Sequence, residues 1–243
     1  LPSQPPVDLF QREHRRGVRL FVNRVFIMDD CEELVPVWLR FLRGVIDSDD
    51  LPLNVSRELL QDSTVVRVIR KQVTKKTLEM FEELANERPE DYLAAWGHFG
   101  AVLKEGLHLA PEQRGKLSGL IRYRSSGVEG LTSLSEYVER MPKEQSDIYY
   151  VFGETEAAVA SSPHLESLRA KGYEVLYMTD PIDEWAVQGL GEFDEQKLVE
   201  KDRDYRRVVC LDVKTGREIW NRPYDLTGAG GTASHRKLLF GAA

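Results

Sequence analysis

The chain has 243 residues, of which 42% are hydrophobic and 30% are charged, and its formal net charge is −7. This composition is typical of a folded globular protein. The negative balance argues against nucleic acid as a partner, because phosphate contacts need a basic surface. No apolar run approaches the ~20 residues of a membrane span, so we expect no membrane partner. The two cysteines, Cys31 and Cys210, are far apart without a CxxC motif, which favours a reduced, cytoplasmic setting.

Residues 1–86 predict an α/β unit. The run 17–30 is rich in β-branched and aromatic residues and predicts one strand, bent at Asn23. Residues 31–48 carry an apolar stripe at helical spacing and predict a helix. No glycine or proline occurs between Pro52 and Pro89, so we expect one amphipathic helix of about 28 residues there.

Residues 87–200 predict two further parts. These are a helical connector over 87–141 and a second small α/β unit over 142–200. The second unit alternates strands and helices, which favours a largely parallel sheet. The fold class is therefore α/β: a first α/β unit, a connector, a second small α/β unit and a tail. The segments behind this prediction are helices at 89–106, 110–123 and 133–141, a loop at 125–133, strands at 148–153 and 173–180, and helices at 154–172 and 181–193.

The tail, residues 201–243, differs from the rest of the chain in charge. Basic residues exceed acidic residues after Lys201, whereas the preceding part carries the acidic excess, and this change of sign predicts a boundary near residue 200. We expect the tail to form a β-hairpin or to stay mobile, because its glycine-rich end has little apolar surface to bury.

Catalytic and metal-binding motifs are otherwise missing from the sequence. The histidines and cysteines show no metal-ligand spacing, so no metal site is predicted. The turn after the strand at 148–153 has one glycine and an acid, which favours a plain βαβ layer over a dinucleotide site. Tyr92, Trp96, Phe99 and Leu103 form a helical stripe, which indicates core packing or, alternatively, a partner-binding groove.

Arg57 is the residue whose position asks for a functional explanation. Ser56 is typical of a helix N-cap, so Arg57 should lie in the first turn, where the helix dipole disfavours a cation. A surface ion pair with Asp49 or Asp50, worth roughly 0 to 1 kcal/mol, is one explanation. The other is an anion bound by Arg57, the free amides of the helix end and Gln61, one turn on. The residues alone leave both open.

Several segments resemble, in the same order, the middle segment of the heat-shock protein 90 chaperones, including the bacterial form. The resemblance spans about Leu1 to Val199. The matching segments read VFIMDD, LPLNVSRE, IRKQVTKK, IYYVFGET, SSPHLESLRAKGYEVLYMTDPIDEW and EFDEQKLV. Beyond them, RRVVCLDVKTGREIWNRPYDL resembles one repeat of a quinoprotein-type β-propeller, and a single such repeat cannot bury its faces alone.

The chaperone resemblance implies a role for Arg57. In the family, an N-terminal domain binds ATP with magnesium, and the middle segment supplies an arginine that contacts the γ-phosphate. The matching residue is Arg57, with Gln61 and Asn54 as polar neighbours and Phe26 as apolar support for the same surface. The nucleotide-binding and C-terminal dimerisation domains match no part of this chain. We therefore expect it to hold no cofactor and to be inactive alone.

The resemblance also implies partners: the chaperone N-terminal domain, client proteins and co-chaperones. It further implies that the first unit is a truncated three-layer α/β unit, whose incomplete sheet would leave an unpaired edge and apolar surface around Leu20 to Ile27, which predicts self-association. Two other functions stay open at this point. The chain could be a non-catalytic protein-interaction module, or, if the tail decides its function, a component of a quinoprotein-like propeller.

Overall fold

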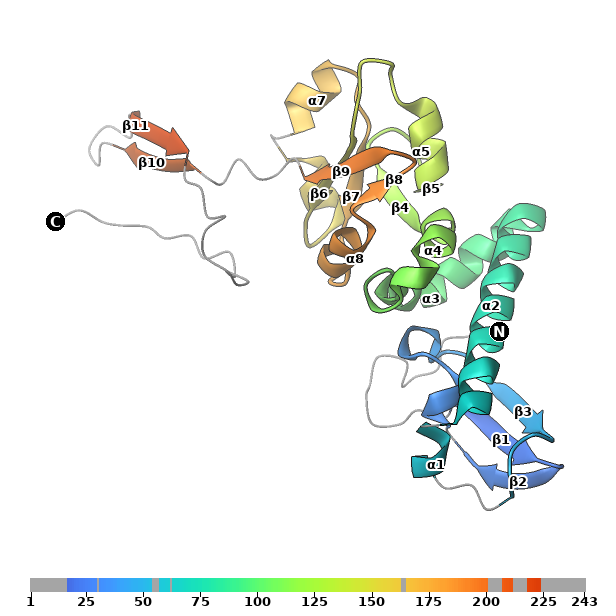
Figure 1. The fold of residues 1–243 in the computed structure, drawn as a ribbon. Coiled ribbons are helices and arrows are strands. Elements are labelled where there is room, and N and C mark those ends of the chain that lie inside the picture. The colour runs from blue at the N-terminus through green and yellow to red at the C-terminus, as the bar shows by residue number, and fades with distance from the viewer. Residues whose placement is uncertain are drawn as a thin grey trace. The chain divides into compact units, whose positions relative to one another are not determined.

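The fold is known from a computed structural model and consists of two compact units, Leu1–Glu200 and Lys201–Ala243 (Figure 1). Among the helices described, none combines the length and apolar character needed to cross a bilayer. The structure describes the backbone of residues 17–29, 31–53, 57–61, 63–162, 165–200, 207–211 and 218–223.

The first sheet has three strands in the order β2-β1-β3. β1 (Val18–Val22) and β2 (Val25–Met28) form an antiparallel hairpin. Asn23 and Arg24 make its two-residue turn with φ of 50° and 65°, as the primed hairpin turns require. The prediction of a single bent strand over 17–30 is therefore wrong: the bend at Asn23 is a full reversal of the chain.

Residues 31–48 do not form the predicted helix. They fold as two short 3-10 turns, η1 (Glu32–Leu34) and η2 (Val37–Leu39), followed by β3 (Gly44–Ser48), which runs parallel to β1. Val35 is extended, with φ −133° and ψ 129°, because the following Pro36 disfavours a helical conformation in the residue before it. The apolar spacing came from two separate turns and a strand, and it imitated one helix.

The long helix predicted across residues 56–87 is also interrupted. α1 (Arg57–Gln61) ends before Ser63, and α2 (Thr64–Glu87) begins after it. Ser63 is extended, with ψ 125°, and its hydroxyl accepts a hydrogen bond from the Val66 amide at 3.4 Å. A serine cap of this kind starts a new helix, so it separates α1 from α2 without glycine or proline.

α1 and α2 pack on the first sheet through one small core. Leu20 and Val22 of β1, Leu60 of α1 and Val66 of α2 are each at most 3% exposed and belong to the same cluster. Successive residues of a strand face opposite sides, so Arg19 and Phe21 of β1 face away from this core. The other side of the sheet is thus the exposed one.

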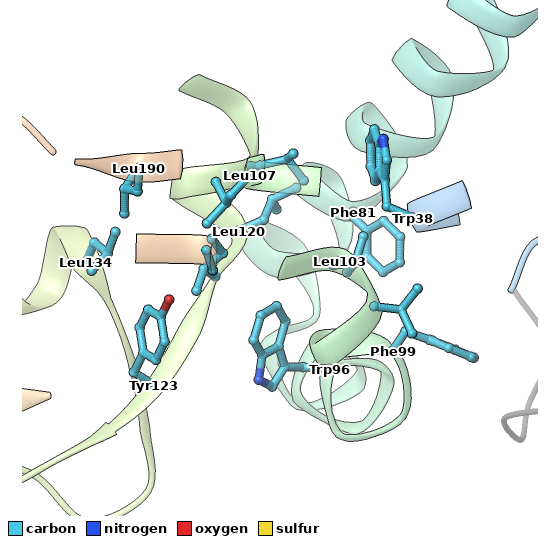
Figure 2. Packing of buried hydrophobic residues seen from close by; sticks show 14 of the residues in the cluster. Trp38, Phe81, Trp96, Phe99, Leu103, Leu107, Leu120, Tyr123, Leu134 and Leu190 are labelled. Atoms are coloured by element: carbon cyan, nitrogen blue, oxygen red, sulfur yellow. The ribbon is translucent and has the colours of Figure 1, made fainter. Parts of the chain in front are cut away.

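The central helix α3 (Pro89–Leu109) carries the largest core of the molecule. Its stripe Tyr92, Trp96, Phe99 and Leu103 is buried, so the core-packing interpretation is confirmed. Ion pairs add to this packing, since Arg40 after η2 binds Glu105 with both of its terminal nitrogens, at 2.5 and 2.7 Å. Figure 2 shows ten labelled members of this core: Trp38, Phe81, Trp96, Phe99, Leu103, Leu107, Leu120, Tyr123, Leu134 and Leu190.

The second sheet has six strands in the order β5-β4-β7-β6-β9-β8. β6 pairs in parallel with β7 and β9, as the alternation of elements predicts, while β4 and β8 pair antiparallel to their neighbours. The predicted loop over 125–133 is shorter in the structure: it joins β4 to β5, and its last three residues form β5, which pairs antiparallel with β4. The strands are β4 (Arg122–Ser125), β5 (Leu131–Ser133), β6 (Ile148–Phe152), β7 (Val175–Met178), β8 (Glu192–Phe193) and β9 (Gln196–Glu200).

In the part of the chain that the structure describes, five helices surround this sheet or lead into it (Figure 1). Ser133 and Glu136 form a capping box at the start of α5, which fixes the beginning of this helix directly after β5. The helix predicted over 154–172 has two described parts on either side of Pro163. The five are α4 (Arg114–Leu120), preceded by η3 (Pro111–Gln113), α5 (Leu134–Arg140), α6 (Glu156–Ala160), α7 (Glu166–Ala170) and α8 (Asp183–Leu190).

The compact unit Lys201–Ala243 has one described feature, an antiparallel pair of strands. β10 (Arg207–Leu211) pairs with β11 (Glu218–Pro223), with Cys210 opposite Trp220. The hairpin expected for the tail is thus present in the described residues.

Candidate functional site

The predicted arginine site begins at α1, which follows β3 and the loop around Leu51. Leu60 is fully buried against β1 and α2, whereas Glu58 and Gln61 are exposed. The buried leucine therefore anchors α1 and turns its polar face outward. Arg57 is the first residue of this helix.

Part of the predicted site lies outside the described residues. This holds for Asn54, for Ser56 and for the side chain of Arg57. The expected meeting of Arg57 with Asn54 and Gln61 therefore stays a prediction, and so does the alternative ion pair with Asp49 or Asp50.

Phe26, the predicted apolar support, lies on β2 and is 51% exposed. It pairs with Phe21 across the hairpin, and the two rings meet edge to face with centroids 5.6 Å apart. Phe21 faces away from the core that holds Leu60. Phe26 therefore belongs to the exposed face of the first sheet.

A second cluster of charged residues lies between α3 and α8. The ammonium of Lys104, in α3, is 2.7 Å from Oδ2 of Asp180 and 2.7 Å from Oδ1 of Asp183. The side chains of Lys104 and Asp183 are 4% and 0% exposed. The same ammonium lies 4.4 Å from the centroid of the Tyr123 ring, within cation–π range.

Burial dominates the electrostatics of this cluster. It raises the pKa of Asp183 above its ordinary value, while the Lys104 ammonium opposes that shift. Burial, with help from the Asp183 and Asp180 charges, also raises the pKa of Tyr123 well above its ordinary value. Tyr123 is therefore neutral, and the charged groups beside it are paired with each other, so the cluster offers no reactive group. We interpret it as a structural link between α3 and α8, which we call the Lys104–Asp183 tie.

Sequence reasoning missed this tie. Lys104 is a charge within the apolar stretch FGAVLKEGL, and such a residue needs a buried partner. Asp180 lies 76 residues away along the chain, and the buried partner Asp183 follows three residues later. Pairing Asp180 with Lys104 also supports the plain βαβ interpretation of the second unit over a ribose-binding role.

An aromatic patch extends along the exposed side of the α3–α8 contact. Trp185 of α8 is 46% exposed, and its ring lies 5.3 Å from that of His108. Leu109, at the end of α3, is 52% exposed. In the part of the chain that the structure describes, no group of three His, Cys, Asp or Glu residues could hold a metal ion.

Comparisons with known proteins agree with this arrangement. The sequence model of the Hsp90 protein family matches residues 1–212. The chaperone protein HtpG of Myxococcus xanthus is 66% identical over 199 residues, which are 82% of this chain and 30% of that protein. HtpG of Geobacter metallireducens is 49% identical over 205 residues, covering 84% of this chain and 32% of that protein.

Among solved structures, the middle domain of a Plasmodium falciparum putative heat shock protein is similar, with a TM-score of 0.73 and 31% identity. The match covers 82% of this chain and 79% of that one. Two α/β sheets joined by helices are thus the architecture of a chaperone middle domain.

The chain belongs to the Hsp90 family, and it corresponds to the middle domain of the HtpG chaperones. It spans about a third of the length of the curated relatives it matches. The family match runs to residue 212 and so extends past the predicted boundary near residue 200 into β10.

Proposed function

We propose that this chain supplies Arg57 to the ATPase reaction of an Hsp90-type chaperone. In this role the guanidinium of Arg57 binds the γ-phosphate of ATP held by the chaperone's N-terminal domain. Its planar charge then stabilises the negative charge that develops on the phosphate during hydrolysis. Gln61 and Asn54 would position that phosphate by hydrogen bonds.

The observation that carries this proposal is the anchoring of α1. Leu60 is buried, whereas Gln61 is exposed on a helix that begins at Arg57. A helix start with free amides suits one phosphate, and an arginine there gains a partner once the phosphate arrives. The family membership of the chain points to the same residue.

In this proposal the chain contacts one phosphate group of the nucleotide and leaves the rest to the N-terminal domain. Among the described residues, no group of three His, Cys, Asp or Glu residues could hold a metal ion. ATP and magnesium would therefore be held by the N-terminal domain, and this chain alone should neither bind nor hydrolyse ATP.

Client proteins and co-chaperones are the further partners that we propose. The patch formed by Trp185, His108 and Leu109 exposes apolar surface, which suits contacts with partly unfolded chains. The HtpG relatives and the widely separated cysteines favour action in the cytoplasm.

A mixing experiment tests the catalytic role. Purified N-terminal domain of an Hsp90-type chaperone is combined with this chain and ATP, and phosphate release is measured. We expect hydrolysis to rise with this chain and to return to the basal rate with Arg57→Ala. Arg88→Ala, at an exposed arginine in a surface pair with Asp91, should behave as wild type. Equal stimulation by both variants would contradict the proposal.

The second candidate, a non-catalytic interaction module, is favoured by the same exposed aromatic patch. It requires binding of unfolded protein without any effect on hydrolysis. Binding that persists in Arg57→Ala, together with unchanged hydrolysis on mixing, would select it.

A further inference from the structure

A groove of about 670 Å³ is lined by residues of α4, α5, the end of α8 and the β8–β9 hairpin. Apolar side chains form part of its lining: Val138 of α5, Leu190 at the end of α8 and Phe193 of β8. Val138 and Phe193 are partly exposed and Leu190 is 9% exposed. The groove therefore offers an apolar floor to a ligand.

Four carboxylates line the same groove. They belong to Glu139 of α5, Glu192 of β8, and Asp194 and Glu195 of the turn that follows. All four residues are exposed. Within the described part of the chain, none of the four forms an ion pair with a lysine or arginine, although Glu139 interacts electrostatically with its neighbour Arg140.

The cations near the groove do not neutralise this rim. Arg114 also lines the groove, and its Nε donates a hydrogen bond to the Leu107 carbonyl at 2.8 Å. Lys197 stands opposite Glu192 in the β8–β9 pairing. A third cation, Arg140, follows Glu139 in α5 and interacts with it electrostatically. Three cations against four carboxylates still leave an excess of negative charge, and an apolar floor beneath it strengthens attraction to a positive ligand.

We propose that this groove binds a short peptide segment of a partner protein in which basic and apolar residues alternate. The apolar side chains would occupy the floor formed by Val138, Leu190 and Phe193. The lysine or arginine side chains would reach the carboxylates of Glu139, Asp194 and Glu195. Charge complementarity sets the sign of the partner, and the floor excludes a purely polar one.

This site is independent of the proposed ATPase role. Arg57 and α1 do not line the groove. A failure of peptide binding would leave the role of Arg57 untouched, and a failure of the mixing experiment would leave the groove untouched.

The test is fluorescence anisotropy with the full chain and a short fluorescein-labelled peptide in which lysine and leucine alternate. We expect saturable binding that weakens when salt rises from about 50 to about 300 mM, because the rim charges are exposed. A peptide with glutamate in place of lysine, and one with serine in place of leucine, should not bind.

Variants locate the binding. Replacing three rim residues together (Glu139→Gln, Asp194→Asn and Glu195→Gln) should weaken binding roughly tenfold. A matched variant neutralises three exposed carboxylates elsewhere and should bind as wild type: Glu87→Gln, Glu90→Gln and Glu129→Gln. Phe193→Ser, at the floor, should weaken binding while the far-ultraviolet circular dichroism spectrum stays unchanged.

Three results would overturn the proposal. Equal affinity for the glutamate peptide would remove the charge argument, and equal affinity of the two triple variants would place the site elsewhere. Self-association that the rim variant abolishes would make a second copy of this chain the occupant instead of a partner peptide.

Discussion

Lys104 and Asp183 meet at 2.7 Å between α3 and α8, where both side chains are almost fully buried. Two charges removed from water repay that cost only when each keeps its partner. Asp183 also accepts the Asp180 amide at 3.0 Å through its other oxygen. The pair therefore links α3 to the first turn of α8 and fixes the position of one helix along the other.

Removing one member of this pair should be costly. We expect Lys104→Met to lower the free energy of unfolding by about 3 to 5 kcal/mol, because it leaves Asp183 charged and buried alone. Adding Asp183→Asn to that variant should recover part of the loss. Urea denaturation of both single variants and the double variant measures the coupling. Lys76→Ala, in an exposed pair with Glu79, should cost less than about 1 kcal/mol; a similar cost for Lys104→Met would refute the tie.

Close packing of α3 on α8 gives a second prediction. A Cβ added at Gly189 would lie 2.5 Å from the Leu107 carbonyl oxygen, and backbone cannot easily yield. We expect Gly189→Ala to destabilise the protein by about 1 to 3 kcal/mol. The matched control is Gly97→Ala, an exposed position in α3 with nothing within 4 Å, where alanine should stabilise by about 0.5 to 1 kcal/mol. Thermal unfolding of both variants decides, and the two shifts must have opposite signs.

Cys31 should be an unreactive thiol. It is 2% exposed, and burial, with the nearby Glu33 carboxylate, raises its pKa to about 12. An unfolded cysteine has a pKa of about 8.5, so the thiolate fraction falls on the order of 10³-fold on folding. In a Cys210→Ser background, iodoacetamide at pH 8 should modify Cys31 only after denaturation. Rapid labelling of the folded chain would contradict this.

The same shift predicts a loss of stability in alkali. Because the folded pKa is raised, the unfolded chain loses the Cys31 proton first. The protonated Cys31 thiol therefore contributes fully to the free energy of unfolding below about pH 8.5, and this contribution is lost as the pH rises toward 12. Urea midpoints at pH 8 and pH 10 should diverge less in Cys31→Ala than in the parent.

Arg57 is tested most directly in a full-length Hsp90-type chaperone that carries this middle domain. Arg57→Ala should reduce hydrolysis by ~100-fold with little change in nucleotide affinity, because an arginine at the γ-phosphate acts on charge that develops during the reaction. Arg57→Lys should recover only part, since lysine lacks the planar fork. Gln61→Ala should be milder, with a loss of roughly 1 kcal/mol. Normal turnover with reduced stability in Arg57→Ala would return the residue to a surface ion pair.

Self-association remains expected, and part of the predicted surface around Leu20 to Ile27 is exposed. Leu20 is buried in the central strand of its sheet, whereas Val25 and Phe26 within that range are 50% and 51% exposed on β2, and Val45 on β3 is 59% exposed. Light scattering at micromolar concentration should detect oligomers that Phe26→Lys reduces. Val68→Lys, at an exposed valine of α2, is the control and should associate as the parent does.

The sequence predicted best where apolar spacing ran uninterrupted. α3 and the strands β6 and β7 follow directly from their patterns, because α3 buries one apolar stripe and the two strands are buried along almost their whole length. Residues 31–48 misled because Pro36 and a following β-branched strand produced helical spacing by coincidence. Ser63 shows the opposite difficulty: a cap inside a helical pattern is decided by one hydroxyl contact, which spacing cannot reveal.

The candidate site divides in the same way. Arg57 was noticeable from its position beside a helix start, and family resemblance gave it a role. The Lys104–Asp183 tie depends on two segments that only folding brings together. From sequence, Lys104 is noticeable as a charge within an apolar stretch, but nothing identifies Asp183 as its partner.

Two neighbouring residues of α3 form ion pairs with different parts of the first unit. Glu105 pairs with Arg40, which follows η2, and Lys104 pairs with Asp183 at the start of α8. Bending of α3 at this point would break these buried or half-buried charge pairs. This stretch of α3 therefore resists bending, so a displacement of Arg40 would be transmitted to Asp183 through the helix.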